Sequence, residues 1–242
     1  MATDPYRKHA AWYDVLVEPF IVGVRSKSLS LHVPASGASV LEVGCGTGTN
    51  LASYKAAGCR VYGVDLSAAM IAQARKKLSA AAYLQVGDAS QMPYPNDRFD
   101  FILAMLTLHE MPFRIRPKVI KEMVRVLKPQ GRVMLVDYRI GPLAFPIGWI
   151  AKGIVFAFER LAGGNHYKNY CNFIRHRGLE PLLTGGNLTV HRQATSAGGN
   201  VALYLLGRDV SACRESLKKA GMCKPGNRSA AGPTPTRKGI GR

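Results

Sequence analysis

VLEVGCGTGTN, residues 40–50, joins a short apolar run to a turn with glycines at positions 44, 46 and 48. Residues 40–43 predict a buried strand, and residues 48–57 predict the helix that follows it. A glycine-rich turn between a strand and a helix lets the backbone approach a nucleotide-like ligand closely. The stretch therefore predicts a ligand site but leaves three alternatives open: a dinucleotide, a methyl donor, or a tight turn that holds no ligand.

Strand-like and helix-like segments alternate after this turn. Strands are expected at 60–64, 83–86, 99–104 and 132–136, with helices at 68–78 and 118–127. Ser67 is placed to cap the first of these helices. Residues 187–193 and 200–206 then predict an antiparallel hairpin across the turn-rich ATSAGG. We expect an α/β, Rossmann-like fold: a parallel sheet that ends in an antiparallel hairpin, with the ligand at the carboxyl ends of the strands.

The spacing of acids and glycines separates the ligand classes. A dinucleotide fingerprint that starts at Gly44 needs glycine at position 49, where this chain has Thr49. Asp65 ends the second predicted strand, a place where a carboxylate can accept ribose hydroxyls. Asp88 ends the third strand and would lie beside an adenine amino group. This pattern disfavours a nicotinamide oxidoreductase; the alternative to a donor site is that these acids only cap strand ends.

Two further segments, FDFILAMLTLHEM (99–111) and RVLKPQGRVMLVDY (125–138), complete a familiar set with Glu42, the glycines and the two acids. The set resembles the class I S-adenosylmethionine (SAM) methyltransferases, which have seven strands. The resemblance implies SAM as the cofactor, with Glu42 orienting its ammonium group. The donor-binding residues that it implies are Tyr13, Glu42, Gly44, Gly46, Gly48, Asp65, Leu66, Asp88 and Ala89.

The resemblance extends over most of the chain to the ubiquinone/menaquinone-biosynthesis C-methyltransferases (methyltransferase type 11). Their amino-terminal segment is similar to AAWYDVLVEPFIVGVRSKSL, and their last strand is similar to NVALYLLGR. The family implies amino-terminal helices that close over the donor, which makes Tyr13 a donor contact. Residues 106–112 (LTLHEMP) depart from the Gly-Leu-Arg-Asn type of segment in the quinone enzymes. The acceptor is therefore open, with a quinone precursor or a phospholipid head group as the expected lipophilic candidates.

We divide the chain into a helical cap (1–35), a methyltransferase domain (36–207) with a lid insertion at about 141–183, and a basic tail (208–242). The tail is expected to be disordered apart from a short helix at 211–220. Residues 143–158 are almost wholly apolar but shorter than the roughly 20 residues of a membrane span. They predict a lid over an acceptor pocket or, as the alternative, a core-packing helix. Candidate contacts to lipid phosphate are Arg25, Lys27, Lys152 and Arg160.

The net charge of +18 predicts attraction to an anionic partner. Residues 207–242 alone carry nine Lys/Arg against two Asp/Glu. Nucleic acid is disfavoured, because the Asp/Asn-Pro-Pro-aromatic box of amino-methylating enzymes is missing after the fourth strand. The first thirty residues lack the apolar run of a secretory signal. We therefore expect a cytosolic protein with peripheral contact to an anionic membrane, and the oligomeric state stays open.

Methyl transfer from a sulfonium is an in-line displacement, so the protein mainly positions donor and acceptor and excludes water. An acidic acceptor proton also needs a base, and His109 is the best candidate because it follows the fourth strand on the ligand side. Its alternative is a cap or packing residue. Tyr138 is the second catalytic candidate, ahead of His166, Tyr167 and Tyr170. No metal site is expected, since the six histidines lack ligand spacing. The competing hypothesis is a non-catalytic protein with the same donor fold.

Overall fold

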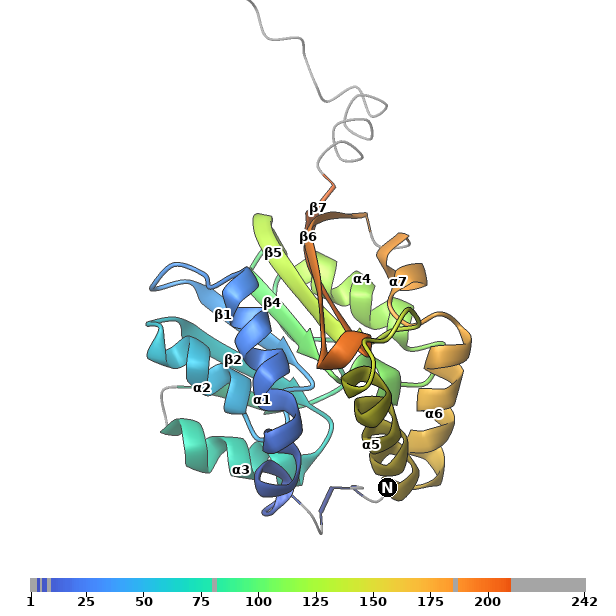
Figure 1. The fold of residues 1–242 in the computed structure, drawn as a ribbon. Coiled ribbons are helices and arrows are strands. Elements are labelled where there is room, and N and C mark those ends of the chain that lie inside the picture. The colour runs from blue at the N-terminus through green and yellow to red at the C-terminus, as the bar shows by residue number, and fades with distance from the viewer. Residues whose placement is uncertain (1–3, 5, 8–9, 80–81, 185–186, 210–242) are drawn as a thin grey trace, which may run out of the picture. The chain divides into compact units, whose positions relative to one another are not determined.

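The computed structural model describes residues 4, 6–7, 10–79, 82–184 and 187–209. One seven-stranded sheet runs through this part of the chain in the order β3-β2-β1-β4-β5-β7-β6 (Figure 1). The strands are β1 (Ser39–Val43), β2 (Arg60–Asp65), β3 (Tyr83–Val86), β4 (Phe99–Met105), β5 (Leu127–Tyr138), β6 (Leu188–Ser196) and β7 (Val201–Arg208). The helices are α1 (Tyr13–Leu31), α2 (Thr49–Ala56), α3 (Ala68–Leu78), α4 (Arg116–Val126), α5 (Ile147–Leu161), α6 (Gly164–Arg175) and α7 (Glu180–Thr184). Two short 3₁₀ turns complete the fold, η2 (Leu108–Glu110) and η3 (Ala197–Gly199).

The pairing of the strands confirms the predicted fold class. Strands β3, β2, β1, β4 and β5 are parallel neighbours, whereas β7 pairs antiparallel with both β5 and β6. The chain leaves β1 toward β2 on one side and returns to β4 on the other, so the topological switch point lies between β1 and β4. In such sheets the ligand binds at the carboxyl ends of the strands beside the switch point. The glycine turn after β1 lies at that place.

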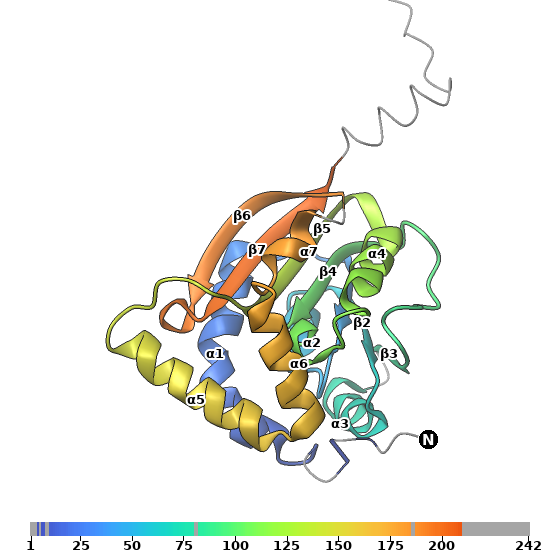
Figure 2. The ribbon, with the colours of Figure 1, turned by 90° about the vertical axis from the view of Figure 1, so that its right-hand side faces the viewer.

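Helices cover both faces of the sheet (Figures 1 and 2), and an apolar layer on each face holds them to it. One layer joins the sheet to α1, α2 and α3 through Val24, Leu51, Tyr54, Ile71 and Leu78. The other joins it to α4 and α6 through Val119, Ile120, Met123, Val126 and Phe173. All of these side chains are at most 3% exposed. Helix α5 stands apart from both layers, since Gly148 and Glu159 are its buried residues.

The junction between α4 and β5 differs from the prediction. The helix spans Arg116–Val126, and β5 begins at Leu127, five residues before the predicted strand. Leu127 pairs with Phe99 and Arg132 pairs with Phe101, so the residues between them on β5 form an irregularity in the ladder. Pro129 and Gly131 were expected to end a helix and precede a strand; they lie instead inside this irregular part of β5, where a missing ladder hydrogen bond is tolerated.

The two predicted hairpin strands are present as β6 and β7, each displaced by one to three residues from its predicted bounds. β7 ends at Arg208, close to the predicted domain end; the domain boundaries themselves stay predictions. The helix predicted at 211–220 lies outside the described residues. Within the described ranges, no helix combines the length and apolar character that crossing a membrane requires.

Candidate active site

The glycine turn is shaped by its backbone conformation and by a close neighbour. Gly44 has φ +66°, and a Cβ there would lie 2.7 Å from Thr107 Cβ, so a side chain fits neither the conformation nor the space. Gly46 has φ +50°, yet a Cβ on it would meet no atom within 4 Å. The turn is therefore packed against Thr107 on one side and open on the other. Gly48 begins α2 as its N-cap.

Asp65, at the end of β2, holds this turn in place. Its Oδ2 accepts the Gly46 N–H at 2.8 Å and its Oδ1 accepts the Ser67 N–H at 2.8 Å. Burial raises the pKa of this carboxyl above its usual value, because the charged form loses hydration. A carboxylate has more lone pairs than these two bonds use. Asp65 can therefore fix the turn and still accept hydroxyl groups of a ligand.

The remaining predicted donor residues near this edge follow β2 and β3. Leu66, directly after β2, is 73% exposed. Asp88 accepts the Ser90 N–H at 2.7 Å, and Ala89 next to it is buried. These residues supply an apolar surface and an acid on the side of the glycine turn where the predicted adenine would lie.

Glu42 lies within the core, one layer behind the turn. Its Oε1 accepts from Asn50 Nδ2 at 2.6 Å, and Asn50 Oδ1 accepts from Arg25 Nε at 2.6 Å. Arg25 is 8% exposed and forms an ion pair with Glu18. Burial raises the pKa of Glu42 to about 8, and its Oε2 has no hydrogen-bond partner among the described residues. One buried acceptor atom is thus left for a ligand, which fits the predicted donor site.

The residues ahead of α1 reach over the carboxyl ends of the strands. Asp4 accepts from Ser67 Oγ at 2.9 Å, and the Tyr6 hydroxyl donates to Glu110 Oε2 at 2.7 Å. The rings of Tyr6 and Tyr13 meet edge to face, with centroids 6.0 Å apart. Burial raises the pKa of Tyr13 well above its usual value. This segment therefore covers the predicted donor side of the sheet.

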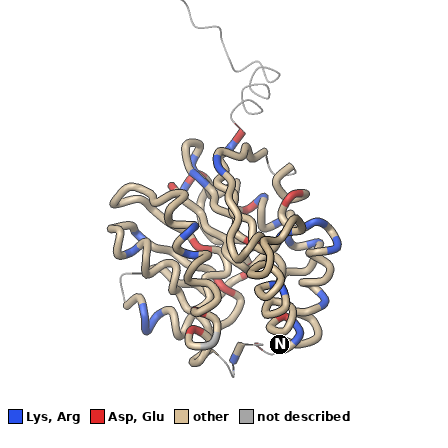
Figure 3. The backbone as a smooth tube through the Cα atoms, in the orientation of Figure 1, with Lys and Arg blue, Asp and Glu red and all other residues tan. Residues whose placement is uncertain are grey.

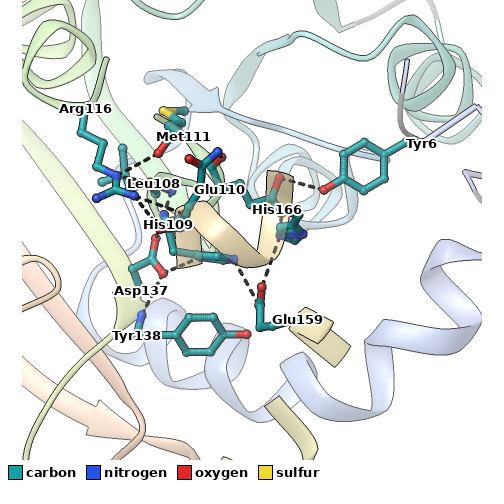
Figure 4. Close-up of polar contacts among 11 residues, drawn as sticks. Tyr6, Leu108, His109, Glu110, Met111, Arg116, Asp137, Tyr138, Glu159 and His166 are labelled. Carbon is teal, nitrogen blue, oxygen red and sulfur yellow. Dashed lines mark hydrogen bonds and ion pairs between the residues drawn. The ribbon is translucent and has the colours of Figure 1, made fainter. Parts of the chain in front are cut away.

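A second polar group lies on the far side of Glu110, where η2, β5, α5 and α6 meet (Figure 4). His109 Nδ1 is 2.7 Å from Asp137 Oδ1, and His109 Nε2 is 3.3 Å from Glu159 Oε1. His166 Nε2 is 3.4 Å from Glu159 Oε2 and 3.5 Å from Glu110 Oε1. His109, Asp137 and Glu159 are each at most 4% exposed. Two imidazoles thus share one buried carboxylate.

Opposing effects act on the pKa of His109. Burial lowers it, but the carboxylates of Asp137 and Glu159 outweigh burial and hold the pKa well above its usual value. The ring of Tyr138 lies 4.7 Å from that of His109, and burial together with Glu159 raises the pKa of its hydroxyl well above 10. The site therefore favours positive charge at His109. The general-base role of His109 and the catalytic role of Tyr138 stay predictions.

Comparison with known proteins decides the family. Residues 41–135 match the family model described as a methyltransferase domain. The chain is 30% identical over 194 residues to a demethylmenaquinone methyltransferase of Clavibacter sepedonicus, a match that covers 70% of this chain and 78% of the relative. The chain belongs to the class I SAM-dependent methyltransferases. SAM is therefore the cofactor of this methyltransferase, as the glycine turn and the two acids predicted.

A second relative names a different acceptor. The methyltransferase is 38% identical over 121 residues to a phosphatidylethanolamine N-methyltransferase of Cereibacter sphaeroides, which covers 47% of this chain and 58% of that relative's length. Two solved structures share the fold. One is a chain of the complex between the Haloferax volcanii Trm112 methyltransferase activator and a methyltransferase, with TM-score 0.64, 16% identity and coverage of 86% and 99% of the two chains. The other is a SAM-dependent methyltransferase from Aquifex aeolicus, with TM-score 0.56, 18% identity and coverage of 81% and 97%.

The structure of this methyltransferase brings most of the predicted donor residues to one edge of the sheet. The glycines, Asp65, Leu66, Asp88 and Ala89 lie at the ends of neighbouring strands, with Tyr13 in the covering segment and Glu42 behind the turn. Their individual contacts with SAM stay predictions. Arg25 was predicted as a contact to lipid phosphate, and this is wrong because the side chain is buried and paired with Glu18.

Sequence reasoning missed several residues of the site. Asn50 and Asp137 act through hydrogen bonds to Glu42 and His109, which no motif spacing reveals. Arg116 links η2 to α6 through the carbonyls of Leu108 and Asn169. A signal did exist for Glu159, since it is the single acid of helix α5, whose other charged residues are Lys152 and Arg160. A carboxylate is costly to bury without a partner, so an acid in a mostly apolar helix indicates one.

Proposed function

We propose that this methyltransferase transfers the methyl group of SAM to a lipophilic acceptor, a quinone precursor or a phospholipid head group, that it takes from an anionic membrane surface. The exposed apolar side of α5, next to the polar group around His109, carries this proposal. The named activities of the two relatives agree with it, since one acts on a quinone precursor and the other on a phospholipid.

The apolar surface of α5 is large and unusual for a helix on the surface of a protein. Phe145, just before the helix, is 86% exposed, and five apolar side chains of the helix are between 52% and 83% exposed: Ile147, Trp149, Ile150, Phe156 and Leu161. Several large apolar side chains exposed on one helix are suited to contact with a partner, a membrane or a lipophilic ligand. Because Glu159 on the same helix reaches the His109 group, a molecule held by this surface would lie close to the polar site.

Helix α1 extends the apolar surface, and basic residues accompany it. Phe20 of α1 meets Phe158 of α5 edge to face, with ring centroids 5.0 Å apart. Lys152 lies over the Trp149 ring at 6.0 Å, an arrangement typical of residues that bury an apolar stem beside a charged head. The other Lys and Arg residues are spread along the described part of the backbone (Figure 3). A net charge of +18 draws the whole chain toward anionic lipid, while α5 supplies the apolar contact.

SAM supplies an electrophilic methyl group on a sulfonium. The glycine turn and Asp65 would hold the donor. The segment around Tyr6 and Tyr13 would cover the donor and exclude water from it. The acceptor atom would then face η2 and β5, where His109 and Tyr138 lie. Holding two reactants in line is worth several kcal/mol of the barrier, so positioning accounts for most of this catalysis.

The donor site is tested by titration calorimetry with SAM and S-adenosylhomocysteine. We expect Asp65→Asn to weaken SAM binding by about 10- to 100-fold, because a hydrogen bond to a charged group contributes roughly 1.5–3 kcal/mol. Asp97→Asn is the matched control. Asp97 lies in the loop before β4, at the amino-terminal end of that strand and away from the glycine turn, and it pairs with Arg208. Unchanged SAM affinity in Asp65→Asn would contradict the donor site.

The acceptor is tested by incubating the protein with methyl-labelled SAM and either a lipid extract or an aqueous extract. We expect label in the lipid fraction and binding to anionic vesicles in sedimentation. Trp149→Ser together with Ile150→Ser should reduce both and leave SAM affinity unchanged, because these side chains are exposed on α5. Label in the aqueous fraction alone would refute the lipophilic acceptor, and SAM binding without turnover on either extract would favour the non-catalytic alternative.

A further inference from the structure

Two histidines and one glutamate converge at the junction of η2, α5 and α6. One ligand-type atom from each of His109, Glu159 and His166 lies within 4.8 Å of the other two. His109 lies in η2, whereas Glu159 and His166 lie on the consecutive helices α5 and α6, so the folding of these helices over η2 brings the three residues together. Imidazole nitrogen and carboxylate oxygen are the ligands that divalent first-row transition metals accept in proteins.

The distances suit a small cation. In a tetrahedral site with metal–ligand bonds of about 2.0–2.2 Å, neighbouring ligand atoms are separated by roughly 3.3–3.6 Å. His109 Nε2 lies 3.3 Å from Glu159 Oε1, and His166 Nε2 lies 3.4 Å from Glu159 Oε2. Each imidazole is thus one such separation from a different oxygen of the shared carboxylate, His109 from Oε1 and His166 from Oε2.

Two atoms of the group lack hydrogen bonds. Glu159 Oε2 and His166 Nε2 are buried and lie 3.4 Å apart, yet neither makes a hydrogen bond with the described residues. Glu159 itself is 4% exposed. A buried polar atom that makes no hydrogen bond costs about 1–3 kcal/mol. A bound cation would satisfy both atoms at once.

Asp137 orients the His109 ring through its Nδ1 atom, on the side of the ring away from Glu159. Its Oδ1 lies 2.7 Å from His109 Nδ1, and its Oδ2 accepts the backbone N–H groups of Leu108 at 3.0 Å and His109 at 3.1 Å. Asp137 is fully buried and cannot turn away. A carboxylate that fixes one ring nitrogen so that the other faces a metal recurs around metal-bound histidines.

We propose that His109 Nε2, His166 Nε2 and the Glu159 carboxylate bind a divalent first-row transition metal ion such as Zn²⁺. Three protein ligands leave at least one coordination position open. In this site His109 is a metal ligand and not the predicted general base. The proposal is independent of SAM binding, because it uses no residue of the donor site.

The test uses the full, untagged chain, stripped of metal and titrated with Co²⁺ as a spectroscopic probe. We expect one equivalent of Co²⁺ to produce visible d–d absorption, and Zn²⁺ to displace it. His166→Gln and Glu159→Gln should each weaken Co²⁺ binding by at least about 100-fold, more than the 10- to 100-fold typical for loss of an outer hydrogen-bond partner. Circular dichroism of both variants checks that they fold.

His176→Gln is the matched control. His176 is exposed at the end of α6 and lies outside the group, so this variant should bind Co²⁺ as the unaltered protein does. Failure of the unaltered protein to bind Co²⁺ or Zn²⁺, or equal binding by all three variants, would overturn the proposal. Calorimetry with SAM on the same metal-free sample separates the two ideas: SAM binding without metal binding overturns this site alone, and metal binding without SAM binding overturns the proposed function alone.

Discussion

Glu42 gives the folded protein a pH dependence of its own. Burial raises the pKa of its carboxyl from the usual 4.5 to about 8. Between these two values the folded chain keeps a proton that the unfolded chain releases. Stability must therefore fall as the pH rises from about 4.5 to about 8, by at most ~1.4 kcal/mol per pH unit from this group.

Glu42→Gln removes this titration and retains an oxygen for Asn50 to donate to. We expect the variant to become more stable relative to the unaltered protein as the pH rises from 5.5 to 8: the difference in the free energy of unfolding, variant minus unaltered protein, should increase. Urea unfolding without SAM at several pH values measures the difference, in which the titration of all other groups cancels. Parallel stability profiles for the two proteins would show that Glu42 is ionised in the folded state.

The functional residues differ in how well their positions in the site could be predicted from the sequence. Gly44 and Asp65 could be predicted because a ligand that must approach the backbone requires glycine and an acid at fixed places on consecutive strands. Glu159 and His166 could not be paired with His109, since their meeting depends on how α5 and α6 fold back over η2. Metal-ligand spacing is visible in a sequence only when the ligands share one element or one loop.

At the scale of elements, Arg116 at the start of α4 connects three of them. Its guanidinium donates to the carbonyls of Leu108 and Met111, each at 3.0 Å, and to Asn169 O at 2.8 Å. It also lies over the Phe173 ring at 4.9 Å. The side chain is 2% exposed. The position of η2 relative to α6 thus depends on one planar group with several donors.

Arg116→Lys should destabilise the protein by about 2–4 kcal/mol, because an ammonium cannot serve carbonyls on several sides and leaves some of them buried without a donor. Urea unfolding measures the loss. Arg114→Lys, on an exposed residue just before α4, is the control and should change stability little. A loss in Arg116→Lys no larger than in the control would mean that packing alone fixes η2 against α6.

Elements whose apolar periodicity is strong were predicted well, and their junctions were not. The helix before β5 ends within one residue of its predicted end, at Val126. The start of β5 was missed because Pro129 and Gly131 suggest an interruption, whereas the long β4 next to it offers Phe99 as a pairing partner for Leu127. Local residue preferences are overridden where a neighbouring strand extends the sheet.

At the scale of the whole molecule, the parallel sheet with an antiparallel hairpin could be predicted because strands that alternate with helices form parallel sheets. The exposed apolar surface of α5 was predicted as a lid, but its separation from both core layers was not, since an apolar helix has the same sequence pattern when it packs in a core. Whether an apolar segment is buried depends on whether the rest of the fold leaves a core position for it.

The insertion of β7 between β5 and β6 constrains the order in which the chain can assemble. Arg132 pairs with Gly207 and Tyr138 with Val201. Because α5, α6 and α7 lie between these strands in the sequence, β5 pairs with its second neighbour, β7, only across this long connection. Contacts this distant in sequence slow folding, because the chain loses the entropy of a long loop before the pairing compensates. Until the hairpin docks, β5 presents an apolar, unpaired edge of the kind that recruits other chains. Aggregation during refolding should therefore start at β5, in a species whose donor-side strands have already formed.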